Sequence, residues 1–119
     1  MVALTGDGSY MFSQPSTVHW MARKYQTPFL QVVYNNRGWK APKFSALAVH
    51  PDGYASRAAD IDVSFDPAAR LRRHRRRRRR HHGHTIRNPR EVEDAIAEAL
   101  RVVRSEGRCA VLDVWLPPL

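Results

Sequence analysis

The chain alternates between two kinds of hydrophobic pattern. Continuous apolar runs of strand length occupy residues 1–5, 29–34 and 109–116. Between them, residues 14–25 and 92–103 repeat apolar side chains at helical spacing, which predicts two amphipathic helices. Continuous apolar strands that alternate with amphipathic helices indicate a parallel sheet. The predicted fold class is therefore α/β, a partial parallel sheet flanked by helices. With a first strand at the very start of the sequence, we expect it to be a piece of a larger sheet.

Local signals predict where the two helices begin and end. Ser13 is the expected N-cap of the first helix, and Pro15 suits its first turn. Asn88 and Glu91 have the spacing of a capping box, in which Asn88 accepts from the first-turn amides and Glu91 reaches back. Gly107 is expected to end this second helix.

We expect the segment between the second strand and the second helix to lack regular structure over most of its length. Residues 39–67 are predicted to form a long loop with a turn at Pro51-Asp52-Gly53. Within it, His50, Asp52 and Tyr54 either line a substrate pocket or flank this turn, and the turn is the interpretation we favour.

Composition fits one small domain and adds few constraints on location. The chain has 119 residues, and no apolar stretch is long enough to span a membrane. The N-terminus lacks the basic and apolar regions of a secretory signal. Cys109 lies in an apolar run, where we expect a buried, inert thiol. An intracellular, cytoplasmic location is the expectation that follows.

The net charge of +9 comes from one segment. Nine arginines stand between residues 70 and 80, and the other basic residues equal the acidic residues in number. We therefore divide the domain into residues 1–67, an arginine- and histidine-rich low-complexity segment at 68–84, and residues 85–119. The arginine run is a solvated linker or an arm that binds nucleic acid; the absence of interleaved aromatic residues disfavours single-strand binding.

Two polar loops follow the first two predicted strands. Gly6-Asp7-Gly8-Ser9 follows the first strand, and Asn35-Asn36-Arg37-Gly38 follows the second. Ligands of open parallel sheets bind beyond the carboxyl ends of the strands, so neighbouring strands would bring these loops together. Glycine amides can approach phosphate oxygens, and carboxylate and amide oxygens are the ligands that Mg²⁺ prefers. The loops suit a Mg²⁺–diphosphate, and the alternative is two ordinary turns.

A family resemblance favours the first alternative. The segment GDGSYMFS, with Asn36 of PFLQVVYNNRGW 29 positions after Asp7, resembles the GDG…NN motif of thiamine-diphosphate-dependent enzymes. The end, EVEDAIAEALRVVRSEGRCAVLDVWLPPL, resembles the last helix and strand of that family's C-terminal cofactor-binding domain. The resemblance covers nearly the whole chain except residues 68–84. It indicates the group of acetolactate synthase, pyruvate decarboxylase and benzoylformate decarboxylase.

The resemblance implies the ligands of the cofactor. It implies that the side chains of Asp7 and Asn36 and the carbonyl of Gly38 bind Mg²⁺. It also implies a thiamine diphosphate whose diphosphate meets the amides of Gly8 and Ser9. The cofactor-binding residues expected in all are Gly6, Asp7, Gly8, Ser9 and Asn36.

The resemblance also implies a reaction and its partners. Family members decarboxylate 2-oxo acids or join carbon units, and they are usually at least dimers. Their cofactor lies between two domains, with a glutamate from the other domain promoting catalysis. The chain does not contain that segment, so we expect residues 1–119 alone to be inactive.

The same resemblance gives a third interpretation of the arginine run. Family members usually have an alanine-rich helix at this place. In GC-rich DNA, alanine codons translated in another frame become arginine codons. The run is then a frame-shifted alanine-rich helix, with the frame restored near Thr85.

Overall fold

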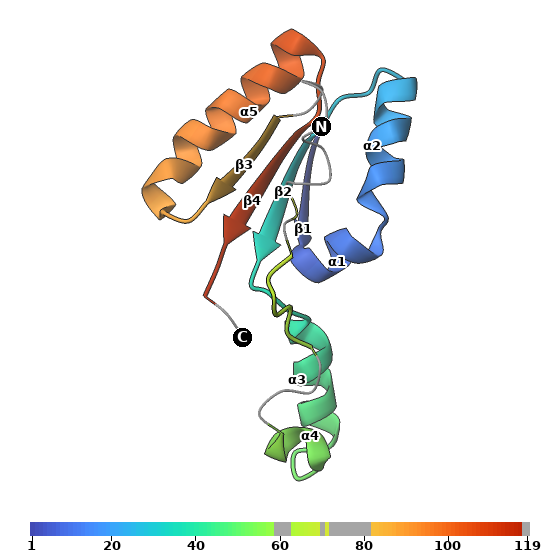
Figure 1. The fold of residues 1–119 in the computed structure, drawn as a ribbon, viewed down its shortest axis with the longest axis vertical. Helices are drawn as coiled ribbons and strands as arrows, with labels where there is room; N and C mark the ends of the chain where they lie inside the picture. The colour runs from blue at the N-terminus through green and yellow to red at the C-terminus, as the bar shows by residue number, and fades with distance from the viewer. Residues whose placement is uncertain (59–62, 70, 72–81, 118–119) are drawn as a thin grey trace.

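The chain folds as a four-stranded, fully parallel sheet with helices on both faces (Figure 1). The computed structural model describes residues 1–58, 63–69, 71 and 82–117. The strands, in their order across the sheet, are β1 (Val2–Gly6), β2 (Leu30–Asn35), β4 (Ala110–Trp115) and β3 (His82–Ile86). The predicted α/β class is confirmed. The fourth strand, β3, was not predicted, and it crosses the boundary that we drew at residue 84.

Helices cover the two faces of the sheet and extend past its end. In Figure 1, α2 lies on one side of the strands and α5 on the other, while α3 and α4 project beyond the carboxyl end of β2. The helices are α1 (Asp7–Phe12), α2 (Pro15–Lys24), α3 (Lys40–Val49), α4 (Tyr54–Arg57), the 3₁₀ turn η2 (Pro89–Glu91) and α5 (Val92–Glu106). No helix in the described part of the chain is long and apolar enough to cross a membrane.

The two central strands are apolar on both faces because both faces are covered. On the α5 side, Leu30 and Leu112 pack with Ala99 of α5 in a cluster whose members are all buried. On the opposite side, Val33 and Val111 pack with Tyr10 of α1. A third cluster joins α2 to the strand ends through Ala22, Phe29 and Cys109, and the buried Cys109 thiol agrees with the sequence prediction.

The prediction of a long loop over residues 39–67 was wrong. Two helices, α3 and α4, occupy much of this segment. Neither helix has a buried residue, so neither packs an apolar stripe against the sheet. In α3, Phe44 and Leu47 do recur at helical spacing, and this signal was missed. Pro42 lies in the first turn of α3, where its missing N–H has no helical partner to lose. The Pro51-Asp52-Gly53 turn is confirmed: the Gly53 amide donates to the His50 carbonyl at 3.1 Å.

Two further expectations concern the helix starts. Ser13 does not cap α2; Gln14 is its N-cap, and the Ser13 hydroxyl donates to the Tyr10 carbonyl at 3.0 Å. Asn88 accepts from the Arg90 amide at 3.1 Å, as predicted, but it caps the 3₁₀ turn η2. The N-cap of α5 is Glu91, which makes no side-chain capping bond. The arginine run at residues 72–80 lies outside the described residues, as does Arg70; Leu71, between them, is buried.

Replacing Gly107 with alanine is expected to destabilise the domain by about 1 kcal/mol. Gly107 ends α5 with φ of 61°, a left-handed conformation that penalises a Cβ, although no atom lies within 4 Å of that Cβ. Urea denaturation measures the loss. Asparagine tolerates this conformation better, so Gly107→Asn should lose less; equal stability of the wild type and Gly107→Ala would contradict the assignment.

Candidate functional site

The two polar loops meet at one edge of the sheet, as predicted. Strands β1 and β2 are parallel neighbours, with Gly6 in register with Tyr34, so their carboxyl ends lie side by side. Gly6 ends β1 and is the N-cap of α1, which places Gly8 and Ser9 in the first turn of that helix. The GDGS segment is therefore a strand-to-helix junction and not an isolated turn.

Asp7 links the two loops directly. Its carboxylate is 3% exposed. Oδ1 accepts from the Gly8 amide at 2.9 Å, and Oδ2 accepts from the Gly38 amide, in the other loop, at 3.1 Å. Burial raises the pKa of Asp7 above its ordinary value of 3.8, and the hydrogen bonds from Gly8 and Gly38 offset part of that rise. A buried carboxylate with only amide donors around it is a favourable place for a cation.

Asn36 brings a second oxygen to the same point. Its side-chain Oδ1 accepts from the Gly38 amide at 3.2 Å, so Asp7 and Asn36 share this one donor. Gly38 is itself held by an antiparallel bridge to Ser64. A carboxylate oxygen and an amide oxygen are hard donors of the kind that Mg²⁺ prefers. Within the described part of the chain, no group of three histidine, cysteine, aspartate or glutamate residues could hold a metal ion, so a metal here would also need amide or carbonyl oxygens.

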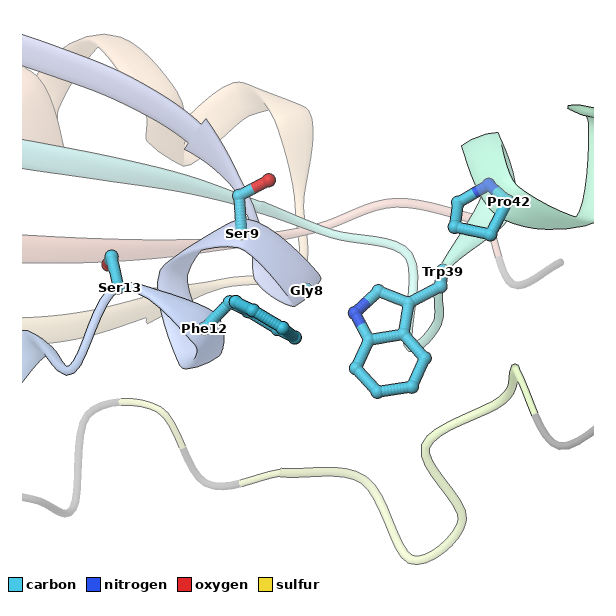
Figure 2. Close-up of a pocket in the computed structure, with 6 residues that line it drawn as sticks. All are labelled: Gly8, Ser9, Phe12, Ser13, Trp39 and Pro42. Atoms are coloured by element: carbon cyan, nitrogen blue, oxygen red, sulfur yellow. The ribbon is translucent and has the colours of Figure 1, made fainter.

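A cavity of about 630 Å³ opens beside this loop junction, between α1 and the start of α3 (Figure 2). The rings of Phe12 and Trp39 point toward one another across it in Figure 2. Gly8 forms part of its wall, and a Cβ on Gly8 would overlap Cδ1 and Nε1 of Trp39. The complete lining is Gly8, Ser9, Phe12, Ser13, Trp39 and Pro42.

The residues of the HPDGY segment do not join this site. His50 and Asp52 lie in the connection between α3 and α4, and Tyr54 is the first residue of α4; none of the three lines the cavity. The Tyr54 side chain is 95% exposed. Their place in the structure supports the interpretation of this segment as a turn.

Sequence reasoning missed a buried polar group next to the site. Asp113 of β4 is 3% exposed, and its Oδ1 accepts from the Asn35 side-chain amide at 2.9 Å. Its Oδ2 accepts from the Thr85 hydroxyl at 3.4 Å and from the indole N–H of Trp115 at 3.3 Å. The signal in the sequence was a single acid inside the apolar run CAVLDVWL, which a strand interior admits only when the acid has partners.

Comparison with known families gives one match over most of the chain. Residues 1–114 match the family model described as thiamine pyrophosphate enzyme, C-terminal TPP binding domain. Comparison with curated proteins and with solved structures gives no match. The matched range contains both polar loops and nearly all of the four-stranded sheet. The chain therefore belongs to the family of C-terminal TPP-binding domains of thiamine pyrophosphate enzymes.

Proposed function

We propose that this domain binds thiamine diphosphate through a Mg²⁺ ion held by Asp7 and Asn36, with the Gly38 carbonyl as the third protein ligand. One observation carries the proposal: the Asp7 carboxylate and the Asn36 amide oxygen, from two different loops, meet at the Gly38 amide. The Asp7 carboxylate alone would repel a diphosphate, and a cation bound between the two groups removes this repulsion.

The chain's own residues divide the work of binding. Asp7 supplies the one negative charge among the proposed ligands, and its burial keeps water from competing for the ion. The first-turn amides of Gly8 and Ser9 are the donors proposed for the diphosphate oxygens. Phe12 and Trp39 give the neighbouring cavity apolar walls that suit the organic part of the cofactor.

The proposed reaction is that of the parent group: decarboxylation of a 2-oxo acid, or carbon–carbon joining as in acetolactate synthase. Bound thiamine diphosphate supplies the carbon nucleophile and electron sink for such steps, and the protein orients it and excludes water. In this division of labour the chain acts as the cofactor-holding half of an enzyme. We propose that residues 1–119 do not catalyse turnover by themselves.

Calorimetric titration of thiamine diphosphate, with and without Mg²⁺, tests the proposal. Binding that requires the metal is the expected result. Absence of binding at millimolar cofactor and metal would contradict it. The arginine run between residues 70 and 80 makes nucleic acid the alternative ligand. Oligonucleotide binding that weakens steeply with salt, with no cofactor binding, would favour that alternative.

Binding of the cofactor with Mg²⁺ is expected to weaken as the pH falls through the raised pKa of Asp7. Only the ionised carboxylate binds the ion, and burial raises this pKa, so the loss should begin at a higher pH than for an ordinary aspartate. The free energy of unfolding of the metal-free domain should change in the opposite direction. A pKa that is higher in the folded state than in the unfolded state stabilises the fold at low pH, and this stabilisation is lost as the pH rises.

Titrations from about pH 8 down to about pH 4 measure the effect, since this range spans the ordinary carboxylate values. The diphosphate titrates as well, so Asp7→Asn serves as the control that keeps the ligand's own protonation. A pH profile of the wild type that matches the profile of Asp7→Asn would contradict the role of Asp7.

A further inference from the structure

We propose that Asp113 is a positioning residue: through Asn35 it holds the turn at residues 36–38 in the conformation that faces Asp7. The consequence for cofactor binding rests on the proposed function, whereas the effect on the turn itself does not. Asp113 lies on a different strand from either loop, and its side-chain hydrogen bonds within the described part of the chain go to Asn35, Thr85 and Trp115.

Asp113 joins the three strands at the carboxyl end of the sheet. It is in register with Val33 of β2 on one side and with Thr85 of β3 on the other. Its Oδ1 accepts from Asn35 at 2.9 Å, and its Oδ2 accepts from Thr85 and Trp115. A carboxylate this deeply buried is tolerated only with several donors, so the set of bonds fixes its orientation.

The bond from Asp113 determines which way the Asn35 amide points. With its nitrogen donating to Asp113, the Asn35 Oδ1 faces the other way and accepts from the Arg37 amide at 3.1 Å. Arg37 has φ of 63°, a left-handed conformation that disfavours a side chain and needs support from its neighbours. That conformation directs the next amide, Gly38, to the oxygens of Asp7 and Asn36.

The end of β4 also packs against the outer side of this turn. The Trp115 ring lies 3.8 Å from the Arg87 guanidinium and 5.4 Å from that of Arg37. The backbone amide of Leu116 donates to the Asn35 carbonyl at 2.9 Å. Asp113 and Trp115 therefore link the strand end to the turn through side-chain, backbone and cation–π contacts that converge on residues 35 and 37.

Hydrogen exchange at the Gly38 amide tests the inference without any ligand. In Asp113→Asn, the new side-chain amide at residue 113 faces the side-chain amide of Asn35. Its NH₂ group cannot accept a hydrogen bond, so the indole N–H of Trp115 faces an amide group in place of a carboxylate. We expect the Gly38 amide to exchange about 10-fold faster or more, while the Val33 amide in β2 stays protected. Asp94→Asn, the same chemical change at an exposed site on α5, should alter neither rate.

Exchanging the two residues should restore the turn. In the double variant Asn35→Asp with Asp113→Asn, the new amide on β4 donates to the new carboxylate on β2, and its oxygen accepts from Thr85 and Trp115. The carboxylate now at position 35 still accepts from the Arg37 amide. Slow exchange at Gly38 should therefore return. A residue that merely contributes to global stability would not be rescued in this way. Should Asp113→Asn fail to fold, Asn35→Ala removes the same link together with the bond to the Arg37 amide, and leaves the other bonds of Asp113 intact.

Cofactor titration supplies the second readout. The affinity for thiamine diphosphate with Mg²⁺ should fall about 10- to 100-fold in Asp113→Asn, as for other residues that orient a metal ligand, and recover in the exchanged pair. Unchanged exchange at Gly38 in both Asp113→Asn and Asn35→Ala would overturn the inference. Failure of the exchanged pair to restore slow exchange would do the same. A wild type that binds no cofactor contradicts the proposed function, and Gly38 exchange still decides the role of Asp113.

Discussion

Asp7→Ala is expected to weaken Mg²⁺-dependent binding of thiamine diphosphate by about 100-fold or more, because losing even an outer partner of a metal ligand costs about 10- to 100-fold. Asp7 is the one carboxylate in the two loops; its Oδ1 accepts from Gly8 in its own loop, and its Oδ2 accepts from Gly38 in the other. Without it, the ion keeps an amide oxygen and a carbonyl but no protein charge. The diphosphate would then rely on backbone amides alone.

The matched controls separate loss of the site from loss of the fold. Asp52→Ala removes an exposed carboxylate from the connection between α3 and α4 and should bind like the wild type. Asp7→Asn keeps the shape of the side chain and removes its charge, so it should resemble Asp7→Ala in binding. Calorimetry measures the affinity, and circular dichroism shows whether each variant is folded. Wild-type affinity in a folded Asp7→Ala would exclude Asp7 as a metal ligand.

Gly8→Ala is expected to lower the free energy of unfolding by about 1 to 3 kcal/mol, as overpacking does in a filled site. Gly8 is buried, and the added Cβ would overlap the Trp39 indole at Cδ1 and Nε1. Trp39 must therefore leave its position, and it carries an edge contact to Phe65, at 5.2 Å between ring centroids, which would be lost.

Two variants test this explanation of the loss. Gly6→Ala adds a methyl group two positions earlier, where no atom lies within 4 Å of the Cβ and φ is −78°, so the change should stay within about 0.5 kcal/mol. In a Trp39→Ala background the overlap is gone, and Gly8→Ala should cost much less than in the wild type. Urea denaturation gives the free energies of all these variants. An equal cost of Gly8→Ala in both backgrounds would show that Trp39 is not the cause.

The sequence predicted most of the sheet and the two site loops because their signals are local. The apolar runs that became β2 and β4 are continuous because these strands are covered on both faces. The run of β1 was equally visible, although β1 is an edge strand whose Val2 and Leu4 are exposed. The loops were found because glycine, aspartate and asparagine directly after an apolar strand indicate a polar loop by their residue types alone. The meeting of Asp7 with Gly38 then followed from the adjacency of β1 and β2.

The missed elements have weak or distant signals. Strand β3, His82–Ile86, is a mostly polar edge strand in which Ile86 is the one buried residue, so it shows no apolar run. Helix α3 has Phe44, Leu47 and Ala48 at helical spacing, a short signal that was overlooked, and it buries no residue. The pairing of Asp113 with Asn35 joins residues 78 positions apart, and only the folded sheet brings them together.

Paramagnetic broadening by Mn²⁺ tests most directly whether one ion sits between the two loops. Mn²⁺ replaces Mg²⁺ in the complete chain with thiamine diphosphate bound, and amide NMR spectra are compared with those of the Mg²⁺ form. We predict that the signals of residues 7–9 and 36–38 broaden beyond detection while those of α5, which packs on β3 and β4, stay sharp. Sharp signals from Gly8 and Gly38, with broadening at residues 82–84 instead, would contradict a metal site at Asp7 and Asn36.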